Sequence, residues 1–138
     1  MPGRFETWPT FEARARQASL ALVVCLTPLG EVLELSPAYH AAAGRGRLPF
    51  RWLNLPMRNF GVPQDPGTFR AEVARVAQAL RAGDAVMLHC AAGVGRTGTV
   101  AACVLKALGL EAEHALQRVR DAGSNPQNAR QSGLVDWF

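Results

Sequence analysis

The segment His89–Gly98, which reads HCAAGVGRTG, contains two overlapping patterns that point to different chemistry. Cys90 and Arg96 flank five residues, a spacing that suits a sulfur nucleophile and an arginine that binds an anion. The glycines of the same segment spell G-x-G-x-x-G, the pattern of a dinucleotide-binding turn. The elements around the segment must decide between these two patterns.

The dinucleotide pattern lacks the elements that should follow it. A dinucleotide-binding turn leads through a helix to a second strand, which ends in an acidic residue about 20 residues further on. Here the helix runs into Gly109 and then into another helical pattern, where Asp121 lies near a helix end. A phosphate-binding loop of the nucleotide hydrolases also fails, because Thr99 and Val100 stand where a lysine and a hydroxyl residue are required. The sequence therefore disfavours both kinds of nucleotide site.

The cysteine pattern accounts for more of the segment. Between a strand end and a helix start, a short loop can direct consecutive backbone N–H groups at one centre, with the helix N-terminus behind them. Gly93 and Gly95 would supply the unusual dihedrals of such an arc, and the planar guanidinium of Arg96 can hold two phosphate oxygens. Such an electropositive site lowers the pKa of a thiol, so we expect Cys90 to be a thiolate at neutral pH. The residues expected to bind phosphate are Ala91, Ala92, Gly93, Val94, Gly95 and Arg96.

The segment HCAAGVGRTG resembles the signature loop of the cysteine-dependent protein tyrosine phosphatases, in particular their small dual-specificity group. The segments VVCLTPLGEV, LPMRNFGVP and NARQ are similar to that family's early strand and loop, its acid loop and its glutamine-bearing segment. The resemblance implies a phosphatase that uses no metal or cofactor and forms a phosphocysteine intermediate. Cys90 would attack phosphorus, Arg96 and the loop amides would bind the oxygens, and Thr97 would donate a hydrogen bond to the sulfur.

One catalytic position departs from the pattern of this family. The acid loop of the family commonly reads P-x-x-D-x-G-x-P, whereas residues 56–63 here place Asn59 at the position of the aspartic acid. An amide cannot deliver a proton, and general acid catalysis contributes about 10²- to 10⁴-fold. Because an aryl oxygen leaves unprotonated far more readily than an alkoxide, we expect aryl phosphates to be the preferred substrates.

Asp65 is a second candidate for the general acid. It lies six residues after Asn59, in the segment VPQDPGTF. The same residue also fits the N-cap of a helix, because Pro66 would then occupy the first helical position. The two roles do not exclude each other, and the sequence leaves both open.

Glutamines near the C-terminus supply the last candidate site residue. Some relatives carry Glu-Thr-x-x-Gln in this region, and the aligned residues here are Gln127, Asn128 and Gln131. The resemblance implies that Gln131 positions the water of the second catalytic step.

The remaining cysteines and histidines favour structural roles. Cys25 falls in an apolar strand and Cys103 beside a helical stripe, positions typical of core cysteines rather than of redox partners for Cys90. His40 and His114 have no second ligand at a metal-binding spacing. The histidine that precedes Cys90 is expected to brace the loop through hydrogen bonds, because a thiolate needs no base.

The periodicity of apolar residues predicts alternating strands and helices. Three short apolar runs are typical of strands: residues 21–27, 50–56 and 84–90. Three apolar stripes predict helices, at residues 69–80, 97–108 and 112–119, and the short segment 128–138 also has helical potential. Strands joined by helical crossovers imply a mostly parallel sheet. We therefore expect one α/β domain over residues 1–138, a three-layer α/β/α arrangement with helices on both faces of the central sheet.

The composition disfavours several classes of protein. The chain has 138 residues, a formal net charge of +4 with dispersed basic residues, and three cysteines. The charge gives little support to nucleic-acid binding, and no apolar run approaches the roughly 18 residues of a membrane helix. The odd number of scattered cysteines and the lack of a signal-peptide pattern favour the cytoplasm.

Two functions remain open from the sequence. The first is a phosphatase that acts on a phosphorylated protein or a small phosphomonoester, without nucleic-acid or membrane partners. The second is a phosphate-binding module with little or no turnover, which would recognise phosphorylated partners. Cys90 and Arg96 favour the phosphatase, because a pure binding module needs no thiolate. The oligomeric state is left open.

Overall fold

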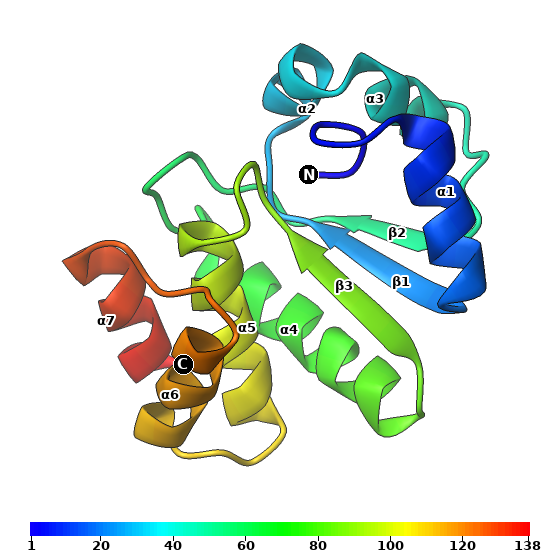
Figure 1. Cartoon of the computed structure of the whole chain (residues 1–138). Coiled ribbons are helices and arrows are strands. Elements are labelled where there is room, and N and C mark those ends of the chain that lie inside the picture. Colours follow the sequence, from blue (N-terminus) through cyan, green and yellow to red (C-terminus); the bar gives the residue numbers. More distant parts are fainter.

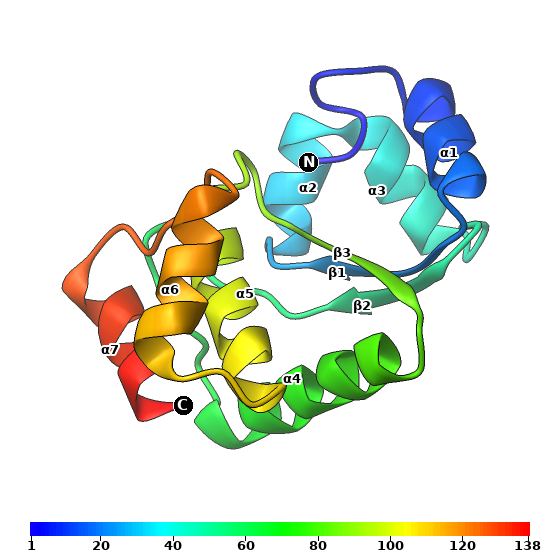
Figure 2. The same ribbon diagram turned by 60° about the horizontal axis from the view of Figure 1, so that its bottom comes forward.

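Three strands and seven helices form the computed structural model, which describes residues 1–138 (Figure 1). In chain order they are α1 (Trp8–Gln17), β1 (Leu20–Cys25), α2 (Leu29–Leu35), α3 (Pro37–Gly44), β2 (Arg51–Asn54), α4 (Pro66–Arg81), β3 (Ala85–His89), α5 (Gly95–Ala107), α6 (Ala112–Asp121) and α7 (Ala129–Trp137). The strands lie at the centre, between two groups of helices (Figure 2).

The strands form one parallel sheet in the order β2-β1-β3. β1 pairs with both neighbours, and the last paired residues, Asn54, Cys25 and His89, stand level with one another. Because the carboxyl ends of parallel strands lie at the same edge of a sheet, the loops that follow the three strands meet there. Each strand matches its predicted run to within two residues at either end, and the predicted α/β fold is confirmed.

Helices cover both faces of this sheet (Figure 2). α1, α2 and α3 lie on one face and α4 and α5 on the other, with α6 and α7 packed against α5. Successive residues of β1 enter the two layers in turn: Val24 belongs to the cluster of Phe69 and Val100, whereas Val23 packs with Phe11. This alternation is expected of a strand that is buried on both faces.

The four predicted helices are present as α4, α5, α6 and α7. In the predicted stripe of α4, Phe69, Val73 and Val76 are buried, whereas Leu80 at the end of the stripe is 36% exposed. α5 begins at Gly95, two residues before its predicted start, because its first turn includes the end of the glycine-rich loop. None of the helices has both the length and the apolar character that crossing a membrane requires.

Three helices lie where none was predicted: α1, α2 and α3. α2 spans only seven residues, and α1 buries only Phe11 and Ala15. Neither helix has enough apolar residues on one face to produce the repeating stripe from which a helix is predicted. The segment TPLGEV, expected to be a loop after the first strand, instead contains the start of α2 at Leu29.

Replacing Leu26 tests the central core. Leu26 directly follows β1 and is fully buried in the largest apolar cluster. We expect Leu26→Ala to lower the free energy of unfolding by about 2–5 kcal/mol, because the packed core closes the resulting cavity only in part. Leu33→Ala, at a position that is 51% exposed, should change it by less than about 0.5 kcal/mol. Urea unfolding followed by circular dichroism measures both, and equal effects would contradict this packing.

Candidate active site

The loops after the strands meet at a pocket of about 360 Å³. Cys90 and Arg96 line it from the segment between β3 and α5, and Asn59 lines it from the loop after β2. Arg4 and Glu31 reach it from the N-terminal part of the chain. The fold therefore brings Cys90, Arg96 and Asn59 together with the predicted loop residues Ala91, Ala92, Val94 and Gly95, and adds residues that were not predicted, Arg4 and Glu31 among them.

Cys90 is almost completely buried, with 3% of its surface exposed. Thr97 Oγ1 donates a hydrogen bond to Cys90 Sγ at 3.1 Å, as predicted, and the backbone N–H of Gly93 donates another at 3.3 Å. Burial alone would raise the pKa of this thiol, but the hydrogen bonds from Thr97, Gly93 and the N–H of Ala92 outweigh burial and lower the pKa below its ordinary value. The environment of the sulfur thus favours the thiolate.

A different steric constraint favours glycine at each of the three glycine positions of the G-x-G-x-x-G pattern. Gly93 has a φ of +80°, in the left-handed region that side chains disfavour. Gly95 lacks the unusual φ that was expected of it; a Cβ there would instead overlap the side chain of Gln127. A Cβ at Gly98 would lie 2.6 Å from the backbone nitrogen of Asn125. The last two glycines therefore let the segment before α7 pack against the start of α5.

The carbonyl groups of the loop are held by groups outside it. Three hydrogen bonds do this: from Arg4 Nη1 to the Ala91 oxygen (2.7 Å), from Ser124 Oγ to the Gly93 oxygen (2.5 Å), and from the Asn125 N–H to the Val94 oxygen (3.3 Å). In a trans peptide the next N–H points opposite to the carbonyl, so the N–H groups of residues 92, 94 and 95 point away from the groups that hold these carbonyls. Together with the positive end of the α5 dipole, they form a surface that suits an anion.

Arg96 is buried and pairs with an acidic residue. Its Nη1 and Nη2 donate to the two carboxylate oxygens of Glu31 at 3.0 and 2.8 Å, and Nη1 also donates to the Met57 carbonyl at 3.1 Å. Burial lowers the pKa of the guanidinium, but the pairing with Glu31 outweighs it and raises the pKa of Arg96. The pair fixes the guanidinium and leaves its other N–H groups for the pocket. Glu31 was not predicted because it lies in α2, a helix without a sequence signal.

His89 braces the loop that follows β3, which contains Cys90, through a chain of hydrogen bonds, as predicted. Trp52 Nε1 donates to Tyr39 Oη at 2.7 Å, Tyr39 Oη lies 2.8 Å from His89 Nε2, and His89 Nδ1 lies 3.2 Å from the Cys90 carbonyl oxygen. Burial lowers the pKa of His89 to about 4, so the imidazole is neutral at pH 7 and has one N–H. The network assigns that proton to Nδ1, which donates to Cys90, while Nε2 accepts from Tyr39.

The loop after β2 is held at the pocket by Asn128, the N-cap of α7, and by Gln131 in the first turn of that helix. Asn128 Nδ2 donates to the Phe60 carbonyl at 2.8 Å, and Gln131 Nε2 donates to the Gly61 carbonyl at 3.2 Å. Phe60 is 57% exposed and has a φ of +59°, which is unfavourable for an aromatic residue. These contacts hold Asn59 and Phe60 at the wall of the pocket that contains Cys90.

Asp65 is the N-cap of α4, one of its two predicted roles. Its carboxylate accepts from Thr68 Oγ1 at 2.6 Å and from the N–H groups of Gly67 and Thr68 at 3.1 and 3.4 Å. These bonds, that of the Thr68 hydroxyl first, lower the pKa of Asp65, whereas a general acid needs a raised one. Asp65 lines a neighbouring cavity together with Arg58, so the structure does not bring it to the pocket of Cys90.

The two glutamines near the C-terminus have different environments. Gln131 is fully buried, and its Oε1 accepts from the N–H of Gln127 at 2.8 Å. Gln127 lines the pocket of Cys90 and lies beside Gly95, whereas Gln131 does not line that pocket. Gln127 therefore belongs to the candidate site, although it was not predicted as a site residue from the segment aligned with the family.

Cys25 and Cys103 are free thiols that lie buried in apolar clusters. Burial raises the pKa of both thiols, that of Cys103 to about 12, so both are uncharged at neutral pH. Their positions agree with the core placement that was expected. No three His, Cys, Asp or Glu side chains gather in a way that could hold a metal ion.

A family of phosphatase domains and a viral protein match this sequence. The family described as "PTP-SAK: Swiss Army Knife protein, DSP-PTPase phosphatase domain" matches residues 7–133. The protein 067L of Invertebrate iridescent virus 3, which is named after the tyrosine phosphatases, is 32% identical over 105 residues. The match covers 73% of this chain and 41% of the viral protein, so the chain spans about two fifths of the length of that relative.

Solved structures of phosphatases have the same fold. Kinase associated phosphatase, in a form whose catalytic-site cysteine is replaced by serine, has a TM-score of 0.80 at 18% identity, over 94% of this chain and 74% of that chain. Tk-PTP in its active form has a TM-score of 0.74 at 24% identity, over 91% and 81%. The human tyrosine phosphatase-like serine/threonine/tyrosine-interacting protein has a TM-score of 0.72 at 18% identity, over 93% and 82%. With the family match over residues 7–133, this chain belongs to the dual-specificity-type phosphatase domain family of the Swiss Army Knife proteins.

Proposed function

We propose that this protein hydrolyses phosphomonoesters through a phosphocysteine intermediate on Cys90, with aryl phosphates as preferred substrates. The observation that carries this proposal is the buried sulfur of Cys90, which accepts hydrogen bonds from Thr97 and Gly93 and whose pKa is lowered. The thiolate is the form of cysteine that acts as a nucleophile. Membership of a phosphatase domain family supports the same reaction.

In the first step the Cys90 thiolate attacks phosphorus, so that an S–P bond forms and the P–O bond to the leaving group breaks. The N–H groups of residues 91–96 and the guanidinium of Arg96 hold the phosphoryl oxygens, on which negative charge is spread. Glu31 keeps the guanidinium in place, because both carboxylate oxygens accept from it. In the second step water attacks phosphorus, the S–P bond breaks, and the thiolate and orthophosphate are released.

The second step needs a group that orients the attacking water. We assign this role to Gln127 in place of Gln131, since Gln127 lines the pocket beside Gly95. Both polar atoms of the Gln131 side chain are already bonded, Oε1 to the N–H of Gln127 and Nε2 to the carbonyl of Gly61. Gln131 then acts as a support that fixes the backbone at Gln127.

The preference for aryl phosphates follows from the amide at position 59. Asn59 lies at the pocket but cannot donate a proton to the leaving oxygen. A phenolate with a pKa near 10 leaves without protonation far more readily than an alkoxide does. Asp65 does not replace the missing acid in this proposal, because it caps α4 and faces another cavity.

A phosphate-binding module is the second candidate function. Asn59 favours it, because a module that only binds phosphorylated partners needs no acid. One protein of similar fold is the human tyrosine phosphatase-like serine/threonine/tyrosine-interacting protein. Against this candidate stands the lowered pKa of Cys90, which has no use in a module that only binds.

The proposed substrate is a phosphorylated protein or a small phosphomonoester. A further neighbour in fold, PTPMT1, has been solved in complex with PI(5)P, which adds phosphoinositides to the substrates worth testing. We also propose that residues 1–138 form one catalytic domain and that it acts in the cytoplasm, where its three free thiols would stay reduced.

Replacing the nucleophile and the arginine tests the proposed reaction. The unmodified protein should release p-nitrophenol from p-nitrophenyl phosphate, with a stopped-flow burst stoichiometric with protein if hydrolysis of the intermediate limits turnover. Cys90→Ser should abolish release, and Arg96→Lys should lower kcat/KM by about 10²- to 10³-fold, because lysine cannot hold two oxygens. Arg14→Lys, at an exposed position on α1, should leave kcat/KM unchanged. Tight phosphopeptide binding without any turnover in the unmodified protein would instead establish the binding module.

The pH dependence of Cys90 reactivity tests the origin of its lowered pKa. The thiolate exists above the pKa, so a lowered pKa keeps Cys90 reactive to lower pH than an ordinary thiol. Thr97→Val removes a donor to the sulfur, and we expect it to raise the pKa and move the curve of iodoacetamide alkylation to higher pH. Thr99→Val is the matched control, because the hydroxyl of Thr99 donates to the Gly95 carbonyl and not to the sulfur. The pH curve of alkylation should therefore be the same in this variant as in the unmodified protein. A curve that does not respond to Thr97→Val would refute this account of the thiolate.

Restoring a carboxyl group at position 59 tests the missing acid. We expect Asn59→Asp to raise the turnover of alkyl phosphates by about 10²- to 10⁴-fold and to add a basic limb to the pH profile. The turnover of p-nitrophenyl phosphate should rise much less, since its leaving group needs no proton. Asp65→Asn should leave both profiles unchanged; the loss of a basic limb in that variant would show that Asp65 is the acid after all.

A further inference from the structure

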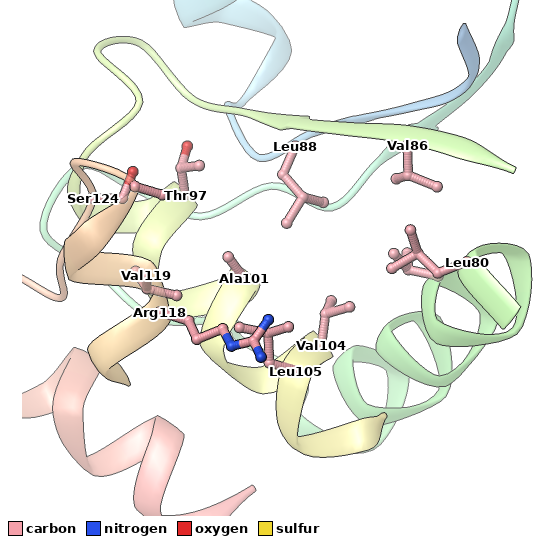
Figure 3. Close-up of a pocket in the computed structure, with 12 residues that line it drawn as sticks. Leu80, Val86, Leu88, Thr97, Ala101, Val104, Leu105, Arg118, Val119 and Ser124 are labelled. Carbon is pink, nitrogen blue, oxygen red and sulfur yellow. The ribbon is translucent and has the colours of Figure 1, made fainter. Parts of the chain in front are cut away.

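A second pocket, of about 330 Å³, lies between β3 and α5 (Figure 3). It is bounded by β3, α4, α5 and α6, and its wall is formed mainly by apolar side chains, among them Leu80, Val86, Leu88, Val104 and Leu105. A volume above about 300 Å³ with an apolar lining is typical of sites for small molecules. Of the residues that line it, the proposed hydrolysis uses only Thr97.

Arg118 is the one charged residue that lines the pocket. Figure 3 shows its side chain extending from α6 across the opening toward Leu105. Its guanidinium takes part in none of the hydrogen bonds or ion pairs within the chain, whereas Arg120 on the same helix donates to Asn125 and Arg81 donates to the Ala107 carbonyl. No acidic side chain lines the pocket, so its charge is complementary to an anion.

Two polar residues on the wall also contact the catalytic loop. Thr97 lines the pocket and donates its hydroxyl hydrogen bond to Cys90 Sγ at 3.1 Å. Ser124 lines it as well and donates to the Gly93 carbonyl at 2.5 Å. A molecule in the pocket would therefore touch two of the groups that hold the loop around the sulfur.

We propose that this pocket binds a medium-chain carboxylate, with its alkyl chain among the apolar side chains and its carboxylate paired with Arg118. The apolar wall excludes a polar ligand, and the unpaired guanidinium selects an anionic head over a neutral or cationic one. Binding displaces Thr97 and Ser124 and thereby changes the reactivity of Cys90. The binding itself does not rest on the proposed hydrolysis.

The first experiment measures the binding of decanoate by isothermal titration calorimetry. Each methylene removed, from decanoate to octanoate and hexanoate, should weaken binding about fourfold. Arg118→Gln should weaken decanoate binding about two- to fivefold, as expected for an exposed ion pair, without affecting 1-decanol. Arg14→Gln, on the opposite face of the sheet, is the matched control and should bind decanoate as the unmodified protein does.

A second variant fills the pocket. Ala101 points into it, so Ala101→Leu should remove decanoate binding, while Ala13→Leu on the exposed face of α1 should not. Iodoacetamide alkylation, which needs no turnover, should show a changed rate at Cys90 when decanoate is present, and no change in Ala101→Leu. The proposal would be overturned if all three carboxylates bound equally well or if Ala101→Leu still bound decanoate. It would also be overturned if decanoate did not change the alkylation rate of Cys90. Binding of an apolar peptide in place of decanoate would overturn it as well.

Discussion

A reactive sulfur that is taken out of water must be compensated by hydrogen-bond donors, and the arrangement around Cys90 depends on this requirement. Burial alone would raise the pKa of the thiol, and the donors from Thr97, Gly93 and Ala92 instead lower it below its ordinary value. The donors point at the sulfur only because the loop forms a tight arc, with φ +80° at Gly93 and its carbonyl groups held from outside. The same arc leaves further N–H groups that point away from the groups holding its carbonyls.

The loop keeps this shape because elements from three parts of the chain support it. The parallel sheet sets His89 level with Cys25 and Asn54, so that everything after the strands begins at one edge. The N-terminal helices add Glu31, which fixes Arg96, and Tyr39, which fixes His89. Because Tyr39, Arg96 and His89 are buried and Glu31 is partly buried, the orientation of the guanidinium and of the imidazole is determined by packing rather than by the loop alone.

The segment before α7 connects the loop that follows β3 with the loop that follows β2. Asn125 bonds the carbonyl of Val94, while Asn128 bonds that of Phe60. Gln127 fits beside Gly95 only because that residue has no side chain. In the proposed reaction the groups for attack, Cys90 and Arg96, are held by these contacts, whereas Asn59 places an amide in the same pocket.

The local pattern HCAAGVGRTG was enough to predict Cys90, Arg96 and the Thr97 contact, because these groups meet within one strand end, one loop and one helix start. The apolar stripes of the second half likewise predicted α4, α5 and α6, and the last segment was predicted as α7 on helical potential alone, whereas the short helices α1 to α3 were not predicted. Glu31 lies 65 residues from Arg96, and Arg4 lies 87 residues from Ala91. Only the tertiary structure could show these partners, and that Gln127 rather than Gln131 lines the pocket of Cys90, because the packing of distant elements decides which donors and acceptors come within reach of one another.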